Sequence, residues 1–197
     1  MMTGTHHLYN YLPTKHEKWL TMIKQEIIDS GLIIDILNAK TMEAVFRLLQ
    51  GCSFLGSFLA YQYTIDMNYS PYINFSENDF VKAGIGAIRG IKKCFLCYGN
   101  KCEDAIWYVK EHFNDLLKRY GYTSFHPLPG HEPTLIDLQN CFCETDKYLR
   151  AKMPELRIGN VRIKQKYMPH TDPIQFFFPP KWNIVEMFKY KPIVVPT

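Results

Sequence analysis

Apolar residues recur at intervals of three and four positions along most of residues 1–150, which is the spacing of one face of an α-helix. The clearest pattern covers residues 102–121, where acidic residues come first, basic residues come last and Gly121 is placed to end the helix. We therefore expect one continuous helix there. Its apolar stripe consists of Ile106, Val109, Phe113, Leu116, Leu117 and Tyr120.

Residues that commonly begin or end helices place the other predicted helices. The first is expected to end at Gly31, and a later one to open at Pro133 and Thr134 and stop before Pro154. Three more are expected over residues 41–50, 53–67 and 79–95. Their predicted starts are Thr41, Ser53, and Ser76 with Asp79 as a capping box.

The character of the chain changes after the last of these helices. Residues 157–168 alternate basic and apolar side chains, as a short hairpin or an extended arm would, and residues 173–183 are rich in proline. The sequence therefore predicts a mainly α, multi-helix single domain over residues 1–155. A basic, Pro- and aromatic-rich C-terminal extension, residues 156–197, is expected to pack on it as a short irregular or β segment.

Length and composition agree with one globular domain. The chain has 197 residues, of which 47% are hydrophobic, and its net charge is +4. The charge is unevenly spread, because residues 1–80 hold 5 basic and 8 acidic side chains whereas residues 81–197 hold 18 and 11. A cluster with Glu155 as its one acid suits phosphate, although a solvated surface is the alternative. It comprises Lys147, Arg150, Lys152, Arg157, Arg162, Lys164 and Lys166.

The first residues lack the apolar core of a signal peptide, so we expect an intracellular protein. It would lie in the nucleus, or in the cytoplasm if the protein is prokaryotic or viral. Residues 48–65 carry no charge, but polar and glycine positions within them favour a buried helix over a membrane span. These include Gln50, Gly51, Ser53, Ser57, Gln62 and Thr64. The six cysteines are expected to be reduced. Cys141 and Cys143 point to different helix faces, which argues against zinc, and no cofactor or metal is predicted.

Four polar residues follow one narrow stripe of the helix that opens at Thr134. At 100° per residue, Asp137, Asn140, Glu144 and Lys147 lie within about 80° of one another, opposite an apolar face. Two carboxylates, an amide and an ammonium in one line suit acid–base chemistry on a leaving group, so these four are the candidate catalytic residues. An ordinary solvated helix surface is the alternative.

A second candidate site is the glycine-rich segment over residues 84–93. It lacks the spacing of a dinucleotide-binding loop or a P-loop, but its backbone amides and basic side chains suit a phosphate. The alternative is that the glycines allow close helix packing or a turn. The candidate phosphate- or DNA-binding residues are Gly84, Gly86, Arg89, Gly90, Lys92, Lys93 and, from the later helix, Arg150.

Three ordered blocks, residues 54–69, 75–91 and 135–150, resemble the helical domain associated with 5-hydroxymethyluracil DNA kinases. They also resemble the related α-glutamyl/putrescinyl-thymine pyrophosphorylase group, which shares features with helix–hairpin–helix DNA glycosylases. The hairpin-like junction over residues 49–60 is similar to the DNA-binding turn of those glycosylases. The positions that match are Asp79, Gly84, Gly86, Arg89, Gly90, Asp137, Gln139, Asn140, Glu144, Lys147, Tyr148 and Arg150.

The resemblance implies a DNA-binding role in hypermodification of thymine or 5-hydroxymethyluracil, in which an amine displaces phosphate from a phosphorylated base. It implies that Arg89 and the 84–90 amides hold phosphate, and that Asp137 or Glu144 acts as the base. Asn140 would then orient the amine, and Lys147 would stabilise the departing phosphate. Because the chain has no P-loop, the kinase would be a separate partner acting in trans. Ile85 also replaces the proline expected in the glycine block.

Three other functions remain open at this point. These are a module that reads modified DNA without chemistry, a glycosylase relative that cleaves a base, and a helical interaction protein unrelated to nucleic acid. No membrane partner is expected.

Overall fold

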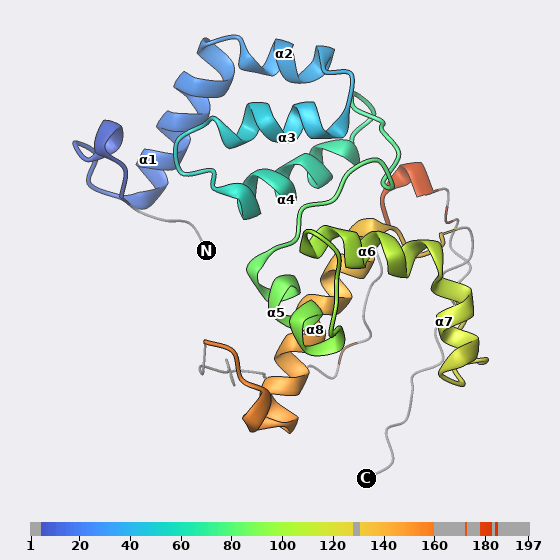
Figure 1. Ribbon diagram of the computed structural model, residues 1–197. Helices are drawn as coiled ribbons and strands as arrows, with labels where there is room; N and C mark the ends of the chain where they lie inside the picture. The colour runs from blue at the N-terminus through green and yellow to red at the C-terminus, as the bar shows by residue number, and fades with distance from the viewer. Residues whose placement is uncertain (1–4, 128–130, 160–171, 173–177, 183, 185–197) are drawn as a thin grey trace.

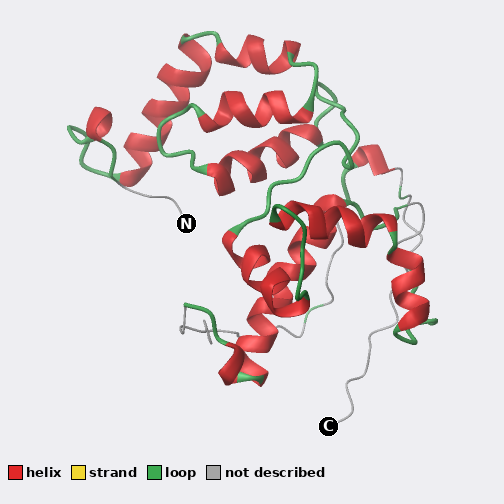
Figure 2. Cartoon of the chain, in the orientation of Figure 1, coloured by secondary structure: helices red, strands yellow, loops and turns green. Residues whose placement is uncertain are grey.

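The structure is a computed structural model that describes residues 5–127, 131–159, 172, 178–182 and 184. Within these ranges the chain forms helices joined by loops and contains no strand (Figure 2). The predicted mainly α, multi-helix fold is therefore confirmed, while most of the predicted hairpin or arm lies outside the described residues. The helices are α1 (Lys15–Met22), α2 (Leu32–Asn38), α3 (Met42–Gln50), α4 (Ser57–Asn68), α5 (Ile85–Cys94), α6 (Cys102–Glu111), α7 (Phe113–Arg119) and α8 (Leu135–Lys152).

Helices α1–α4 form the first of two tiers, in which α2, α3 and α4 lie side by side (Figure 1). Helix α1 continues into a π-helical stretch over Ile23–Asp29. Gly31 follows it with a φ of 81°, a left-handed conformation that glycine adopts without strain, so the predicted helix end is confirmed. The buried apolar side chains of this tier include Met22, Ile36, Met42, Val45, Phe46 and Leu49.

The two predicted starts in this tier have different outcomes. The hydroxyl of Thr41 accepts a hydrogen bond from the Ala44 amide at 3.1 Å, so the predicted cap of α3 is confirmed. The predicted cap at Ser53 is wrong, because α4 begins four residues later, after Gly56. The Ser53 amide instead donates to Glu26 at 2.7 Å, within a tight connection in which the neighbouring Phe54 has a φ of 64°.

A connection over residues 69–84 leads to the second tier. The side chain of Asn68 is fully buried and bonds both backbone groups of Phe75, at 2.8 and 3.1 Å, which folds the connection back onto the end of α4. The predicted capping box of Ser76 with Asp79 is wrong. The Ser76 hydroxyl accepts from the Asn78 amide in a turn, and α5 begins only after Gly84.

Helices α5–α8 form the second tier, in which α5 crosses α8 and α6 packs beside them (Figure 1). Two glycines of α5 occupy the crossing. A Cβ atom on Gly86 would overlap the side chain of Cys143, and one on Gly90 would overlap the backbone carbonyl of Phe142. Only a residue without a side chain lets the two helices approach this closely.

The single helix predicted over residues 102–121 is two helices in the structure. Helix α6 ends at Glu111 and α7 begins at Phe113, because His112 leaves the helical conformation with a ψ of 18°. Its ring Nδ1 lies 2.9 Å from the carbonyl oxygen of Tyr108. The predicted stop is confirmed, since Gly121 has a φ of 78°.

The predicted bounds of the last helix are confirmed. Helix α8 begins after Thr134 and ends at Lys152, two residues before Pro154. Its apolar face packs inward, with Leu135 and Leu138 buried and Phe142 against the core. No helix in the described part of the chain is both long and apolar enough to span a membrane.

Candidate functional site

The polar stripe of α8 lies mostly at the surface, as its spacing predicts. Asn140, Glu144 and Lys147 are exposed, whereas Asp137 is half-buried. Glu144 and Lys147 form an ion pair one turn apart, and this hydrogen bond raises the pKa of Lys147. The side-chain oxygen of Asn140 accepts a hydrogen bond from the side-chain amide of Gln139 at 2.8 Å. At 1.5 Å per residue the stripe extends over about 15 Å, so its two ends cannot meet one small ligand.

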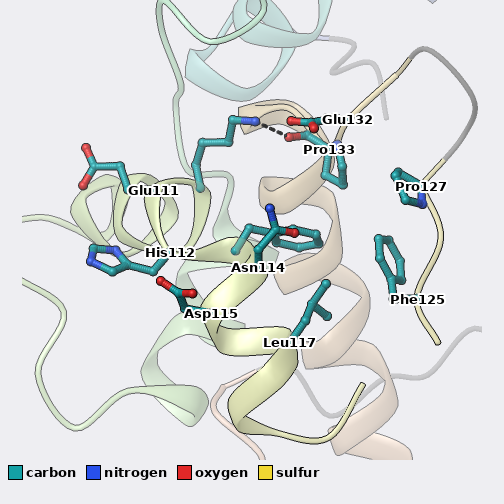
Figure 3. Close-up of a pocket in the computed structure, with 11 residues that line it drawn as sticks. Glu111, His112, Asn114, Asp115, Leu117, Phe125, Pro127, Glu132 and Pro133 are labelled. Atoms are coloured by element: carbon teal, nitrogen blue, oxygen red, sulfur yellow. Dashed lines mark hydrogen bonds between the residues drawn. The ribbon is translucent and has the colours of Figure 1, made fainter. Parts of the chain in front are cut away.

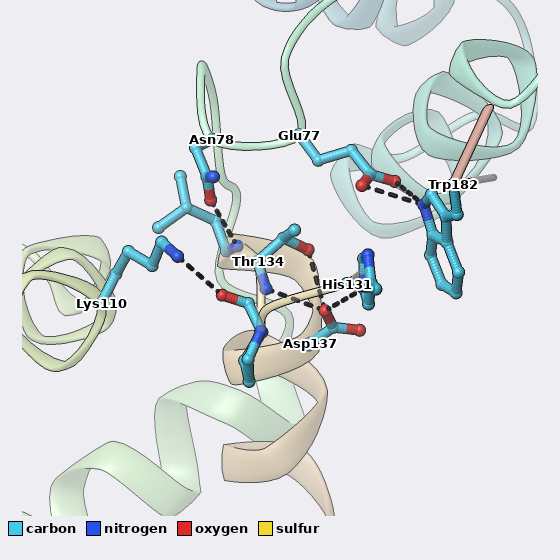
Figure 4. A network of polar contacts seen from close by, with 9 residues as sticks. Glu77, Asn78, Lys110, His131, Thr134, Asp137 and Trp182 are labelled. Atoms are coloured by element: carbon cyan, nitrogen blue, oxygen red, sulfur yellow. Dashed lines mark hydrogen bonds and ion pairs between the residues drawn. The ribbon is translucent and has the colours of Figure 1, made fainter. Parts of the chain in front are cut away.

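Asp137 is bound at the start of α8 (Figure 4). Its Oδ2 accepts from the backbone amide of Thr134 at 2.8 Å and from the hydroxyl of Thr134 at 2.9 Å. The same oxygen lies 3.1 Å from Nε2 of His131. Asp137 therefore closes a capping box and fixes the His131 ring, which is a positioning role as the structure has it.

His131 connects the start of α8 to the C-terminal segment. Its imidazole stacks on the indole of Trp182 with ring centroids 3.7 Å apart. The indole Nε1 donates to both carboxylate oxygens of Glu77, at 3.1 and 3.2 Å (Figure 4). The adjacent Lys181 donates to the backbone oxygens of Asn68 and Phe75 at 2.9 and 3.3 Å. Burial lowers the pKa of Lys181.

Residues from three distant parts of the sequence thus meet at the N-terminal end of α8. The sequence analysis identified Asp137 but missed its partners. Trp182 lies 105 residues from Glu77, and no spacing pattern connects positions so far apart. We define this group as the Trp182 network: Glu77, His131, Thr134, Asp137, Lys181 and Trp182.

The glycine block contacts α8 along its length. The Gly84 amide donates to the Gln139 side chain at 3.2 Å, so this amide is bonded within the protein. Gly86 and Gly90 lie at the helix crossing described above. The contacts of all three glycines match the packing alternative of the sequence analysis. Arg89 is partly exposed and Lys92 is exposed on the same helix.

Lys93 and Arg150, two predicted phosphate-binding residues, meet inside the protein. Lys93 Nζ lies 2.6 Å from Asp146 Oδ1, and the two side chains are only 2% and 1% exposed. Arg150 Nε lies 3.1 Å from Asp146 Oδ2. The sequence analysis missed Asp146, although a signal existed. At 100° per residue, Asp146 falls about 180° from Asp137, on the apolar face of α8, where a carboxylate needs a buried partner.

More positive charge gathers around this buried group. Arg157 Nε donates to the backbone oxygen of Arg150 at 3.2 Å. The Arg89 guanidinium lies beside Gly159, since a Cβ there would be 3.8 Å from it. We define these residues as the cationic end of the α5–α8 pair, four basic side chains and one buried carboxylate. They are Lys93 and Arg150, which both pair with Asp146, together with Arg157 and Arg89.

Several cavities open on the surface of the described residues. One of about 350 Å³ lies between α7 and the loop before α8, with Glu111, Asp115 and Glu132 among its polar lining residues (Figure 3). The Lys110 ammonium closes one side by donating to the Pro133 carbonyl at 2.9 Å. A second, of about 600 Å³, is lined by Tyr98, Tyr108 and Tyr120 among others. A third, of about 740 Å³, adjoins Trp182.

All six cysteines are free thiols, and burial raises the pKa of Cys94, Cys141 and Cys143. Searching the described residues gives no group of three or more His, Cys, Asp or Glu side chains able to hold a metal ion.

These features define a class of protein, a mainly helical two-tier domain without a P-loop that gathers positive charge at one end of its central helix pair. The family model described as "5-hmdU DNA kinase, helical domain" matches residues 1–158, so the chain belongs to this family of DNA-modification kinase helical domains. The resemblance noted in the sequence is thereby confirmed. Neither a curated protein nor a solved structure gave a match.

Proposed function

We propose that this domain binds DNA that carries 5-hydroxymethyluracil, or its phosphorylated form, and acts in base hypermodification beside a kinase supplied in trans. The cationic end of the α5–α8 pair carries the proposal. Two of its four basic side chains, Lys93 and Arg150, pair with the one carboxylate, so the group keeps a formal charge of +3 for a phosphate backbone. Membership of the 5-hmdU DNA kinase family supports DNA as the polyanion.

The basic side chains divide into two roles in this proposal. Lys93 and Arg150 are held by Asp146 and supply a fixed positive field. Arg89, Lys92 and Arg157 are more accessible and contact the phosphates. Fixed charge in a partly desolvated setting attracts anions more strongly than the same charge in water. Each phosphate contact releases condensed counterions, which makes the affinity depend on salt.

A binding experiment tests this proposal. Fluorescence anisotropy with a labelled duplex is measured between 50 and 200 mM salt for Arg89→Gln, Lys92→Gln and Arg157→Gln. Each variant is expected to weaken binding and to reduce the salt slope by about 1. Arg47→Gln is the matched control, because Arg47 pairs with Glu43 on the surface of α3, in the other tier. Unchanged affinity and slope in all three variants would refute the proposal.

The chemistry of the proposed transfer needs a base for the attacking amine. In the transfer, the amine nitrogen bonds to the base methylene carbon, the carbon–oxygen bond breaks, phosphate departs and the amine loses a proton. We assign the proton to Glu144, which is exposed, and the stabilisation of the departing phosphate to its partner Lys147. Asn140 lies one turn away to orient the amine. Asp137 is committed to Thr134 and His131, which favours Glu144 of the two candidate carboxylates.

Product analysis separates this transfer from its alternatives. Mass spectrometry of nucleosides is carried out after DNA with phosphorylated 5-hydroxymethyluracil is incubated with the protein and an amine. An amine adduct that disappears in Glu144→Gln supports the transfer. Tight binding with unchanged nucleosides supports a module that reads modified DNA without chemistry, and abasic sites support a glycosylase relative.

A further inference from the structure

An open cavity of about 740 Å³ lies between the end of α4 and the segment Phe178–Trp182. Ligand sites in proteins commonly have volumes of about 300–1,000 Å³, with apolar walls and a few polar groups. This cavity has that composition and belongs to none of the sites assigned above. Its lining includes Asp66, Tyr69, Ser70, Phe178, Pro180 and Trp182.

Three aromatic rings form the walls. Tyr69 meets Trp182 edge-on, with centroids 5.9 Å apart and planes at 88°, and Phe178 lies 6.1 Å from the same indole. The indole is held from outside the cavity, because His131 stacks on it and Glu77 accepts from its Nε1. Its ring is therefore fixed before any ligand arrives, which lowers the entropic cost of stacking a planar group against it.

The segment that carries Trp182 is fixed as well. The Lys181 ammonium donates to the backbone oxygen of Asn68, the last residue of α4, where the helix dipole favours a cation, and to that of Phe75 in the connection that follows. The wall of the cavity is thus anchored by Lys181, by Glu77 and by His131, on three different elements.

Two polar groups stand at the rim. The Asp66 carboxyl is exposed at its edge, and partial burial raises its pKa. The Ser70 hydroxyl oxygen accepts from the Tyr72 amide at 3.3 Å, which leaves its O–H as a donor. An acceptor and a donor in the lining of one cavity match the imide edge of a uracil-type base, whose N3–H donates and whose C4 carbonyl accepts. A cytosine-type base presents the reverse pattern.

We propose that this cavity binds a uracil-type nucleobase swung out of the DNA helix, stacked on Trp182 and read by Asp66 and Ser70. The inference rests on the proposed function, since it requires DNA at the cationic end. Arg150 of the cationic end and Asp137 of the Trp182 network are 13 residues apart on α8, a rise of about 20 Å. A duplex covers this distance in about six base pairs at 3.4 Å each. Enzymes and readers that reach a base in this way commonly stack it on aromatic side chains.

A matched pair of duplexes tests the imide edge. Each contains one mispaired base, either 5-hydroxymethyluracil or 5-hydroxymethylcytosine, and the two bases share the 5-substituent. The wild-type protein is expected to bind the uracil duplex about tenfold more tightly, as one good pair of base contacts provides. Asp66→Asn is expected to abolish the preference while leaving the salt slope unchanged. Equal binding of the two duplexes by the wild-type protein would overturn the inference.

The stacking is tested separately. Titration with the free nucleoside 5-hydroxymethyl-2′-deoxyuridine is expected to quench tryptophan fluorescence in the wild-type protein but not in Trp182→Phe, which retains Trp19 and Trp107. Trp107→Phe is the matched control, because Trp107 lies on α6 and does not line this cavity, so quenching is expected to persist. The circular dichroism of each variant checks its fold. If Trp182→Phe does not fold, Asp66→Asn still decides the outcome.

The two proposals fail in different ways. Absence of DNA binding by the wild-type protein, or binding that ignores Arg89→Gln, Lys92→Gln and Arg157→Gln, contradicts the proposed function. Salt-dependent binding through the cationic end, with no preference between the two bases and no quenching, contradicts only the base-binding cavity.

Discussion

Gly90 of α5 lies directly against the backbone carbonyl of Phe142 in α8, with no room between them for a Cβ atom. One turn earlier, Gly86 lies against the side chain of Cys143. The two glycines therefore set the separation of the helices, and this separation also brings Lys93 within 2.6 Å of Asp146. Packing at the crossing and the charge arrangement of the cationic end are thus coupled.

The first prediction concerns this crossing. Gly90→Ala is expected to lower the free energy of unfolding by about 1–3 kcal/mol or more, since overpacking forces the backbones apart. Urea denaturation measures the change. Gly56→Ala is the control, because a Cβ at Gly56 meets nothing within 4 Å. Its expected cost is below about 1 kcal/mol, that of a weaker N-cap. Equal losses in both variants would contradict the crossing as the cause.

The second prediction concerns the buried carboxylate. Asp146→Asn is expected to destabilise the protein by about 3–5 kcal/mol, because it leaves the buried Lys93 and Arg150 charges without their counter-ion. DNA binding, measured where the variant remains folded, is not expected to fall with it, since the positive charge increases.

Glu144→Gln provides the matched control on the same helix. Its ion pair with Lys147 is more than half exposed on both sides, so its removal is expected to cost at most about 0.5 kcal/mol. A loss as large as that of Asp146→Asn would show that exposure does not separate the two pairs.

The features of the fold that the sequence predicts correctly are those set by residues close together in the chain. Thr41 and Gly31 were placed correctly, because a cap and a left-handed glycine act within a few residues of the chain. The helix starts predicted at Ser53 and Ser76 are wrong, because tertiary contacts override the local capping signal. Glu26 bonds the Ser53 amide from 27 residues away, and Asn68 holds the connection at Phe75. The break at His112 also had no local breaker such as proline or glycine.

The residues of the candidate site also differ in whether local sequence predicts them. The exposed stripe of Asn140, Glu144 and Lys147 follows from helical spacing alone, and the structure shows it as expected. The same arithmetic would have found Asp146, a carboxylate among apolar positions. Trp182 and Glu77 could not be found in this way, because their hydrogen bond joins segments whose proximity depends on the whole chain path.

The third prediction concerns acid stability. Burial alone would raise the pKa of Glu103, but the Lys82 ammonium at 2.8 Å and the Ala83 amide at 3.0 Å outweigh it and hold the pKa below its ordinary value of 4.5. A lowered pKa in the folded state means that the ionised carboxylate stabilises the fold above pH 4.5. This contribution is lost as the pH falls from 4.5 through the lower folded value.

Glu103→Gln tests the acid effect directly. At pH 7 the variant is expected to be less stable by about 1–3 kcal/mol, since hydrogen bonds to a charged group are lost. Thermal unfolding between pH 7 and pH 3 is expected to show the two proteins converging below pH 4.5. A difference that stays constant over this range would mean that the carboxylate charge plays no part.

The last prediction separates the two roles of Asp137. Thr134 and Asp137 form the capping box at the start of α8. Asp137→Asn and Thr134→Ala are each expected to lower the free energy of unfolding by about 1 kcal/mol, because each breaks this capping box. A direct role in the transfer reaction would make only Asp137→Asn lose modified nucleoside, whereas a purely structural role gives the two variants equal turnover. Urea denaturation and nucleoside mass spectrometry on the same preparations distinguish these outcomes.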